Sequence, residues 1–570
     1  MIFDNNIANI EKRGIIKILM EKKIEKGYPY RNREILVVDL TKDEYSYSPM
    51  AKEIGMKYHG GRALSYKLWD DYADWTTINK ECLYIGAPII ICLGVASDLG
   101  YSFASSSTVL SYSLESKSVV SYNFSSSKLA LTLSSLGFSA LVIKGRARRL
   151  TSIEILKDLV KIDLCESYHN FNTRDIENVV KDYSSLISIG AAGEKCIDYA
   201  SLNIDSKNVG RAAIGAVFGT KNLKYIAFYN NDNAFRNAYF EPLRDHVKHY
   251  FDTRKQVNLL EYANKLGWAA VESYKYRYDP RLWGLGSNLT KDCKIDWLTA
   301  LALGSNLGIY DFKKVEVLEE CCLALGVDPF SISNYLIWII EAESENIINL
   351  KIDKKLPYLS RLIIILEYLS SSKGIFEALS ENVDNLSKKY GFEKNNFTSL
   401  KKELLPLDLR GLKAFSLATA LDDDTLVPWE LFKPLRKKNV AKALYNAQIY
   451  REICETLGIS WKSVMYLANV DGSYKSLNNR FLKILTKVFA ICEGYKISED
   501  TLFDFGKRSF FHRRKIEEKS KENVDYSISN VPIHFLINRA SNFKEKVVSV
   551  GATLDDYLTL IEYEKKKLNI

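Results

Sequence analysis

The sequence contains no C-x-x-C pair, and its nine cysteines are scattered along 570 residues, with Cys321 and Cys322 adjacent. An odd and dispersed set of cysteines does not form the disulfide framework of a small secreted protein. Adjacent helical positions point to different faces, so we interpret Cys321 and Cys322 as core packing. A reducing cytoplasm is the expected location.

A long apolar run is also missing. The longest, residues 82–96, is interrupted by Gly86, Pro88 and Gly94 and is shorter than the ~20 residues of a membrane-spanning helix. We therefore predict a buried strand here and no membrane insertion. The first 26 residues are polar and charged, with apolar residues spaced as on one helix face, so we expect no secretory signal.

Charge of one sign does not dominate, because 79 basic and 70 acidic residues give a net charge of +9. This small excess does not indicate nucleic acid or a membrane surface as a partner. The densest basic run, residues 507–515, is soon followed by Glu517 and Glu518, which favours a solvated helix face over a nucleic-acid patch. The sequence has no Walker loop, nucleophile elbow or dinucleotide-binding fingerprint.

The chain does have the hydrophobic content of an ordinary globular protein, 47%, and a length that predicts several domains. Short β-branched runs at 35–40, 140–144 and 186–189 predict strands, whereas later segments have helical spacing. The predicted fold class is α+β. An N-terminal extension (1–33) precedes a β-rich mixed domain (34–230), and two mostly α-helical domains follow (231–405 and 406–570).

Local signals sharpen some of these elements. Asp311 is placed as an N-cap and Gly326 as a C-cap of one amphipathic helix, and further helices are predicted near 329–348, 356–379 and 437–457. The serine-rich stretches 105–107 and 125–127 lie between apolar runs and are predicted to be loops.

Four segments, in the same order along the chain, resemble the aldehyde ferredoxin oxidoreductase family of tungsten- or molybdenum-pterin enzymes. They are Gly60-Gly61-Arg62-Ala63-Leu64; the stretch from Ile189-Gly190 to Gly219-Thr220-Lys221-Asn222-Leu223-Lys224; Ala302–Ile309 leading to Leu325-Gly326-Val327-Asp328; and Leu407-Asp408-Leu409-Arg410-Gly411-Leu412-Lys413. Any one could arise by chance, but together they indicate homology over about residues 34–465.

The resemblance implies a tungsto- or molybdo-bis-pterin cofactor, with magnesium bridging its phosphates. Glycines beside an arginine let backbone amides approach a phosphate while the guanidinium binds its oxygens; the alternative is a tight turn with the arginine paired to an acid. The positions that match the family's cofactor site, or lie beside it, are Gly61, Arg62, Asn123, Arg211, Ala212, Gly215, Asp328, Asp408, Arg410 and Glu455.

The family's iron–sulfur cysteines are missing. A [4Fe–4S] cluster needs thiolate ligands, yet residues 272–277 contain no cysteine, Cys293 is the only one nearby, and Ser460 stands where the fourth is expected. We therefore expect no cluster and no cluster-based electron route to ferredoxin.

Acid–base residues are also reduced in number. Asp296 retains at best one carboxylate of the family's Glu-Tyr-Glu, and Asp422, Asp423 and Asp424 replace a segment with a proton-transferring histidine. Adjacent carboxylates raise each other's pKa, so Asp423 and Asp296 are weak catalytic candidates; a solvated acidic loop is the alternative.

Histidines offer two further sites. His246 and His249 have a chelating spacing but no third ligand nearby, so no metal site is predicted from them. His59, directly before the glycine pair, could carry charge beside a phosphate, although a packing role is the simpler interpretation.

Two functions remain open on the sequence. One is an oxidoreductase that binds the bis-pterin without a cluster and acts on an aldehyde, a carboxylate or a related small substrate, passing electrons to a partner protein. The other is a catalytically inactive paralogue that serves as a binding or assembly subunit beside an active homologue. The resemblance makes a homodimer reasonable. The retained motifs slightly favour the first function, or another small ligand in the same cleft.

Overall fold

The computed structural model describes residues 34–78, 83–99, 105–125, 127–230, 295–372, 374–393, 396, 398–399, 402–407, 409, 412–427, 430, 437–459, 474–493, 495–521, 526–527, 530–531 and 550–568. The predicted extension, residues 1–33, lies outside this part of the chain.

Two six-stranded sheets form the first domain. The order in the first is β2 (Glu44–Pro49), β1 (Glu34–Asp39), β6 (Phe138–Lys144), β3 (Ile89–Leu93), β4 (Ser106–Ser113) and β5 (Ser118–Ser125). The order in the second is β11 (Lys207–Val209), β10 (Leu202–Ile204), β9 (Ser185–Ser188), β12 (Leu223–Phe228), β7 (Thr151–Ile155) and β8 (Val160–Leu164). One apolar cluster, with Leu36, Ile91, Ile153 and Ile187, is shared by both sheets.

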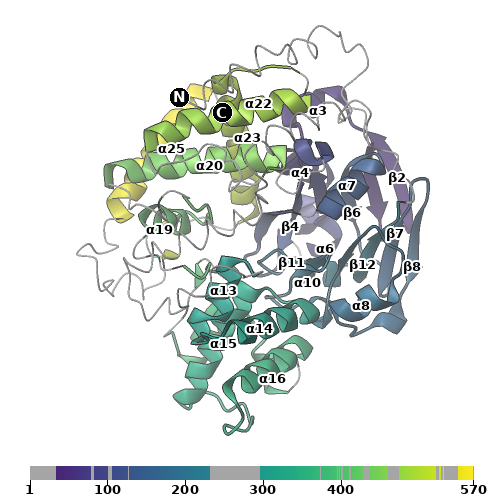
Figure 1. The fold of residues 1–570 in the computed structure, drawn as a ribbon, viewed down its shortest axis with the longest axis vertical. Coiled ribbons are helices and arrows are strands. Elements are labelled where there is room, and N and C mark those ends of the chain that lie inside the picture. The colour runs from purple at the N-terminus through teal and green to yellow at the C-terminus, as the bar shows by residue number, and fades with distance from the viewer. Residues whose placement is uncertain are drawn as a thin grey trace.

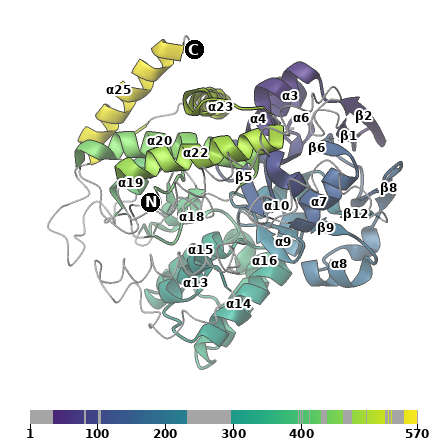
Figure 2. The same ribbon diagram turned by 45° about the horizontal axis from the view of Figure 1, so that its top comes forward.

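Helices follow the sheets along the chain, as the α+β prediction required, and that prediction is confirmed. Figure 1 shows two groups of helices beside the sheets. One group, α13 (Trp297–Leu303), α14 (Phe312–Leu325), α15 (Pro329–Ser344) and α16 (Tyr358–Ser371), lies in the lower part of the view; the other, α19 (Lys413–Ala420), α20 (Val440–Leu457), α22 (Tyr474–Glu493), α23 (Glu499–Ser520) and α25 (Val550–Leu568), lies in its upper left part. Figure 2 shows the same division from a second direction. Of the helices that the structure describes, none has the length and apolarity to cross a bilayer.

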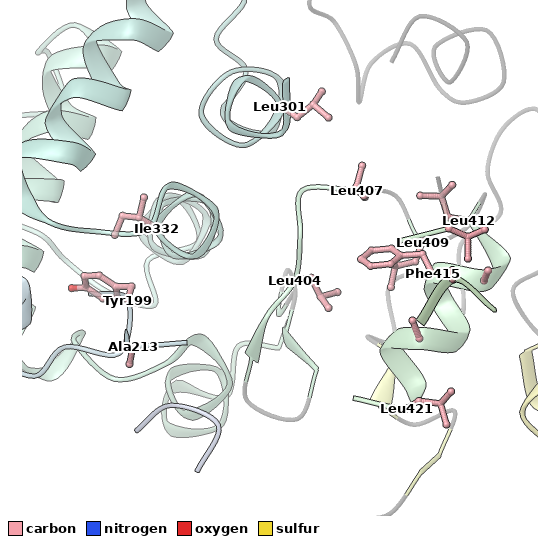
Figure 3. Packing of buried hydrophobic residues seen from close by; sticks show 14 of the residues in the cluster. Tyr199, Ala213, Leu301, Ile332, Leu404, Leu407, Leu409, Leu412, Phe415 and Leu421 are labelled. Atoms are coloured by element: carbon pink, nitrogen blue, oxygen red, sulfur yellow. The ribbon is translucent and has the colours of Figure 1, made fainter. Parts of the chain in front are cut away.

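One large hydrophobic cluster joins the three regions. Tyr199 and Ala213 of the first domain belong to it together with Ile332 of α15 and Phe415 of α19 (Figure 3). Because this core is continuous, the regions are held against one another by apolar burial as well as by polar contacts.

Two helices end in the same way against the first domain. Gly326 and Gly458, after α14 and α20, have φ of 69° and 75°, the left-handed conformation that glycine adopts most easily. A Cβ on Gly190 would lie 2.2 Å from the Leu325 carbonyl oxygen, and one on Gly94 would lie 2.1 Å from the Gly458 Cα. Both helical regions therefore dock through contacts between backbones, where a side chain would not fit.

Two strand predictions are wrong in detail. Ser106, Ser107 and Ser125 lie in β4 and β5 and not in loops. The hydroxyls of Ser106 and Ser125 pair across the two strands, with Ser106 Oγ 2.9 Å from Ser125 Oγ. The apolar run 82–96 contains only the five-residue strand β3, since Pro88 and the flanking glycines interrupt it.

Of the helix predictions, one is confirmed and one is wrong. Helix α14 has the expected Asp311 N-cap and Gly326 C-cap. The predicted solvated face near 507–515 is wrong: Arg513 is 4% exposed and Glu517 is 8% exposed, whereas Lys515 is exposed. These charges are buried because Arg513 pairs with Glu452 and Asp423 and because Glu517 accepts from Tyr66 of the first domain. These partners are distant in sequence, so a local pattern does not reveal them.

Candidate functional site

A cavity of ≈ 80 Å³ lies where the three regions meet. Its walls come from the β4–β5 hairpin, the turn before α10 (Ile214–Thr220), the short strand β14 (Lys402–Glu403), the end of α19 with the loop after it, and α23. Charged side chains that line it are Arg62, Glu115, Arg211, Lys402, Glu403, Asp422, Asp423, Asp424, Arg513 and Glu517.

Arg62, the second residue of α4 (Gly61–Tyr72), is 3% exposed. Its Nη1 donates to Glu455, and its Nε lies 3.5 Å from Glu452 Oε1. Both carboxylates come from α20, so the arginine joins the first domain to the third. Glu455 also accepts from Arg451 Nε at 2.7 Å.

Arg513 of α23 is the centre of this ion-pair network. Its Nε donates to Glu452 at 2.6 Å, its Nη1 to Glu517 at 2.8 Å and its Nη2 to Asp423 at 3.2 Å. Nearby, Lys402 Nζ lies 3.0 Å from Asp422 Oδ1, and Lys521 donates to the same carboxylate. We call these paired side chains, with Arg62, Arg451 and Glu455, the cleft network.

Asp423 differs from the expectation for adjacent carboxylates. Burial alone would raise its pKa, but Arg513 and Arg451 outweigh burial and hold the pKa of Asp423 below its usual range. The raised pKa predicted from adjacency is therefore wrong, and Asp423 is a permanent negative charge and not a proton donor at neutral pH.

Acidification tests this assignment. Because the folded pKa of Asp423 lies below the unfolded value of ~3.9, the stabilisation is complete above ~3.9 and is lost as the pH falls through the folded value. We expect the thermal midpoint to fall below that pH, and to fall less steeply in Asp423→Asn. Scanning calorimetry between pH 6 and the acid limit measures both slopes. Exposed Asp158→Asn is the control; equal slopes in all three proteins would contradict the assignment.

Arg211 lies in a strained turn on the other wall. Ala212 and Ala213 have φ of 52° and 60°, a conformation that side chains other than glycine rarely adopt. The Arg211 Nη2 donates to the Glu403 carbonyl oxygen, and its Nε lies 3.8 Å from Asp328 Oδ2. Asp328 itself caps α15 by accepting from the Ser331 N–H at 2.8 Å.

Glu403 and Glu115 bring two carboxyl groups to the same wall. Burial raises the pKa of Glu403 to about 8. Burial, reinforced by Glu403, raises the pKa of Glu115 well above its usual range. Glu403 is therefore mostly protonated at neutral pH, and burial favours the neutral form of Glu115, unlike Asp423.

The remaining predicted residues lie in different places. Asp296 caps α13 by accepting from Leu298 N–H at 3.0 Å and does not line the cavity as described. Asn123 lies on β5, one residue beyond the lining Tyr122, and its Nδ2 is buried without a hydrogen-bond partner. A Cβ on Gly61 or on Gly215 would meet the carbonyl oxygens of Glu455 and Ser201, at 2.1 and 2.3 Å. Close backbone packing accounts for both glycines.

His59 pairs with an acid and not with a phosphate. Its Nδ1 lies 2.9 Å from Glu493 Oε1, and its ring packs edge-on against Phe489 and Phe505. The packing interpretation is the one that these contacts support. Asp408, Arg410, Ser460, Cys293, His246, His249 and residues 272–277 lie outside the described residues. Within the described ranges, no three His, Cys, Asp or Glu side chains are grouped to hold a metal ion.

Sequence reasoning missed much of this site, namely Glu115, Lys402, Glu403, Arg451, Glu452, Arg513 and Glu517. A usable signal exists for Arg513 and Glu517. They follow Gly506, Ser509 and Phe510 at helical spacing on one buried face of α23, so charges at apolar-type positions could have indicated buried pairs. Glu115 and Glu403 carry no such local signal.

Comparison with known proteins shows which family the chain resembles. Residues 35–230 match the aldehyde ferredoxin oxidoreductase N-terminal domain, and residues 272–566 match domains 2 and 3 of the same family. Over 387 residues the chain is 23% identical to the aliphatic sulfonate oxidoreductase, WOR-like subunit, of Pyrococcus furiosus, covering 56% of this chain and 60% of that protein. It is 23% identical over 345 residues to a tungsten-containing aldehyde ferredoxin oxidoreductase of the same organism, covering 50% and 56%.

The matches thus span three fifths or less of these two relatives, 60% and 56% of their lengths. The tungsten-containing enzyme of Thermococcus kodakarensis is 22% identical over 454 residues, covering 68% of this chain and 72% of that protein. A solved structure, the active site complex BamBC of benzoyl coenzyme A reductase with 1,5-dienoyl-CoA, shares the fold with a TM-score of 0.74 at 15% identity, covering 95% of this chain and 97% of that one. Since the two matched segments together take in most of the chain, it belongs to the aldehyde ferredoxin oxidoreductase family.

Proposed function

We propose that this chain is a family member whose cofactor cleft has become an ion-pair core, and that it serves as a binding or assembly subunit. The observation that carries the proposal is the pairing of Arg62 with Glu455 and Glu452. A phosphate needs a guanidinium fork that is free to bind it. This arginine is paired with carboxylates instead, so we favour the subunit role over the oxidoreductase that the retained motifs slightly favoured.

The cavity supports the proposal by its size. A cavity of ~150 Å³ holds one benzene molecule, and the space here is ≈ 80 Å³. Two pterins with their phosphates are several times larger than benzene. Opening the cleft would separate buried pairs, and removing one partner of such a pair typically costs about 3–5 kcal/mol. The described residues therefore do not fit a bis-pterin.

The names of similar proteins support the subunit role. One relative is named as a subunit, and the structural neighbour is part of a complex. The absence of a C-x-x-C pair in the sequence fits a chain that passes no electrons through a cluster, because such clusters are held by closely spaced thiolates.

A second candidate, the bis-pterin oxidoreductase without a cluster, is favoured by one observation. Arg62 Nε, Arg211 Nε and Asn123 Nδ2 are buried donors without a hydrogen-bond partner, and all three residues were predicted to contact the cofactor. Buried unsatisfied donors are costly, so a ligand at this site would relieve them. The substrate class in that case would be an aldehyde or a related small molecule.

Metal content separates the two candidates. Protein purified from cells supplied with tungstate and molybdate should contain tungsten, molybdenum and iron at far less than one atom per chain, measured by mass spectrometry. The tungsten-containing relative from Pyrococcus furiosus, prepared in parallel, is the positive control. One tungsten or molybdenum atom per chain would contradict the proposal and support the second candidate.

A further inference from the structure

We infer that the remaining cavity binds a small monoanionic oxyanion of three to five heavy atoms, held by Arg211 and Glu403. The inference rests on the proposed function, because a retained bis-pterin would fill this space. The ligand class includes small carboxylates and nitrate, which share size, charge and oxygen acceptors.

Several buried polar atoms of the cavity lining make no hydrogen bond in the described structure, and two of them, besides Arg62 Nε, belong to neighbouring residues. Glu403 is 2% exposed, and its Oε1 makes no hydrogen bond of ordinary geometry, although the Val383 N–H lowers the pKa of the carboxyl group. Arg211 Nε is buried, makes no hydrogen bond, and has Asp328 Oδ2 at 3.8 Å. The two residues are neighbours, since Arg211 Nη2 donates to the Glu403 carbonyl oxygen. Leaving both atoms unsatisfied is unfavourable, and a ligand that contacts both would correct this.

The hydrogen bond to the second oxygen of Glu403 indicates whether the ligand must donate or accept a hydrogen bond. Asn334 Nδ2 donates to Glu403 Oε2 at 3.0 Å, so Oε2 is the accepting oxygen. In the protonated acid the hydrogen then lies on Oε1, which becomes a donor, as is the Nε–H of Arg211. Both residues line the cavity, and donors on its wall call for a ligand with oxygen acceptors.

Charge balance decides between an anion and a cation. The cavity lining holds four basic side chains and six carboxyl groups. Burial raises the pKa of Glu403 to about 8 and also raises the pKa of Glu115, so the neutral forms of both acids are favoured and the six carboxyl groups do not make the wall strongly acidic. A monoanion is then acceptable, whereas a cation would find each ionised carboxylate already paired.

Size limits the ligand. A space of ≈ 80 Å³ is about half of the ~150 Å³ that holds the six carbons of benzene. Formate, acetate and nitrate fit this limit, and benzoate does not.

Binding should be linked to the proton on Glu403, whose pKa is about 8. An anion prefers the protonated site, so affinity should fall tenfold for each pH unit above about 8. Besides each other, Glu403 and Glu115 have these charged or titratable neighbours: Arg211, Asp328, Asp198, Lys402, Tyr122 and Tyr335.

Calorimetric titration of the metal-free protein with formate, acetate and nitrate tests the inference. At pH 7 we expect a Kd of ~1 mM or tighter for at least one of the three, and no binding of benzoate. Glu403→Gln replaces the acid by a permanent donor of the same shape. This variant should keep the affinity and lose the pH dependence.

Arg211→Lys keeps the charge but removes the Nε donor, so affinity should fall at least tenfold, whereas the exposed Arg148→Lys should change nothing. No heat with any of the three anions, or an unchanged pH dependence in Glu403→Gln, would overturn the inference. Tungsten or molybdenum in the same preparation would overturn the proposed function instead, so the two failures are distinguishable.

Discussion

Arg513→Ala should lower the free energy of unfolding by about 3–5 kcal/mol, the effect of leaving buried charges without a partner. The guanidinium binds three carboxylates, on Glu452, Glu517 and Asp423. All three carboxylates are buried, so removing the guanidinium leaves them without this cation in a poorly hydrated environment. Urea titration followed by tryptophan fluorescence measures the change.

Lys515→Ala is the matched control, because it removes the same charge from an exposed position on the same helix. Its effect should stay within ~0.5 kcal/mol. If Arg513→Ala were equally mild, the cleft network would be hydrated, and the argument that it excludes a large cofactor would fail.

Gly326→Ala should lower stability by about 2–5 kcal/mol. Its φ of 69° places an alanine in the left-handed region, at roughly 1–2 kcal/mol, and the new Cβ would lie 2.7 Å from the Gly190 nitrogen. Overpacking of this kind adds about 1–3 kcal/mol, and here the obstacle is backbone, which cannot rotate away.

Gly308 is a control with the same backbone angle. Its φ is also 69°, but a Cβ there meets nothing within 4 Å. Gly308→Ala should therefore show only the conformational part of the loss, and the difference between the variants isolates the contact between the first two domains. Equal losses would mean that the glycine pair is not tightly packed in solution.

The sequence correctly predicted those elements that depend on residues close together in the chain. Helix α14 begins and ends where Asp311 and Gly326 indicated, because an N-cap carboxylate and a left-handed glycine act within one turn. The strands near residues 35, 140 and 186 were predicted from β-branched runs, and they form.

Predictions failed where the structure of a residue depends on a partner that is distant in the sequence. Ser106 and Ser125 are typical loop residues in the sequence, but in the structure each hydroxyl pairs with the other across two neighbouring strands. The local sequence predicts a solvated Arg513, because its buried partner Glu452 is 61 residues away in the chain. For the site, Arg62 and Arg211 were found from the family motifs, but the carboxylates that pair with Arg62 and the acid Glu403 depend on tertiary contacts.

The wide separation of paired residues has a consequence for biosynthesis. Glu455 follows Arg62 by 393 residues, and Glu517 follows Tyr66 by 451. At ~5–20 residues per second, the ribosome needs roughly 20–80 s to deliver the acid that Arg62 awaits. During that interval the nascent first domain presents an unpaired guanidinium and an uncovered Gly94, whereas Gly190 finds its partner earlier, once Leu325 and Gly326 have been synthesised. The first domain thus receives its two docking partners one after the other.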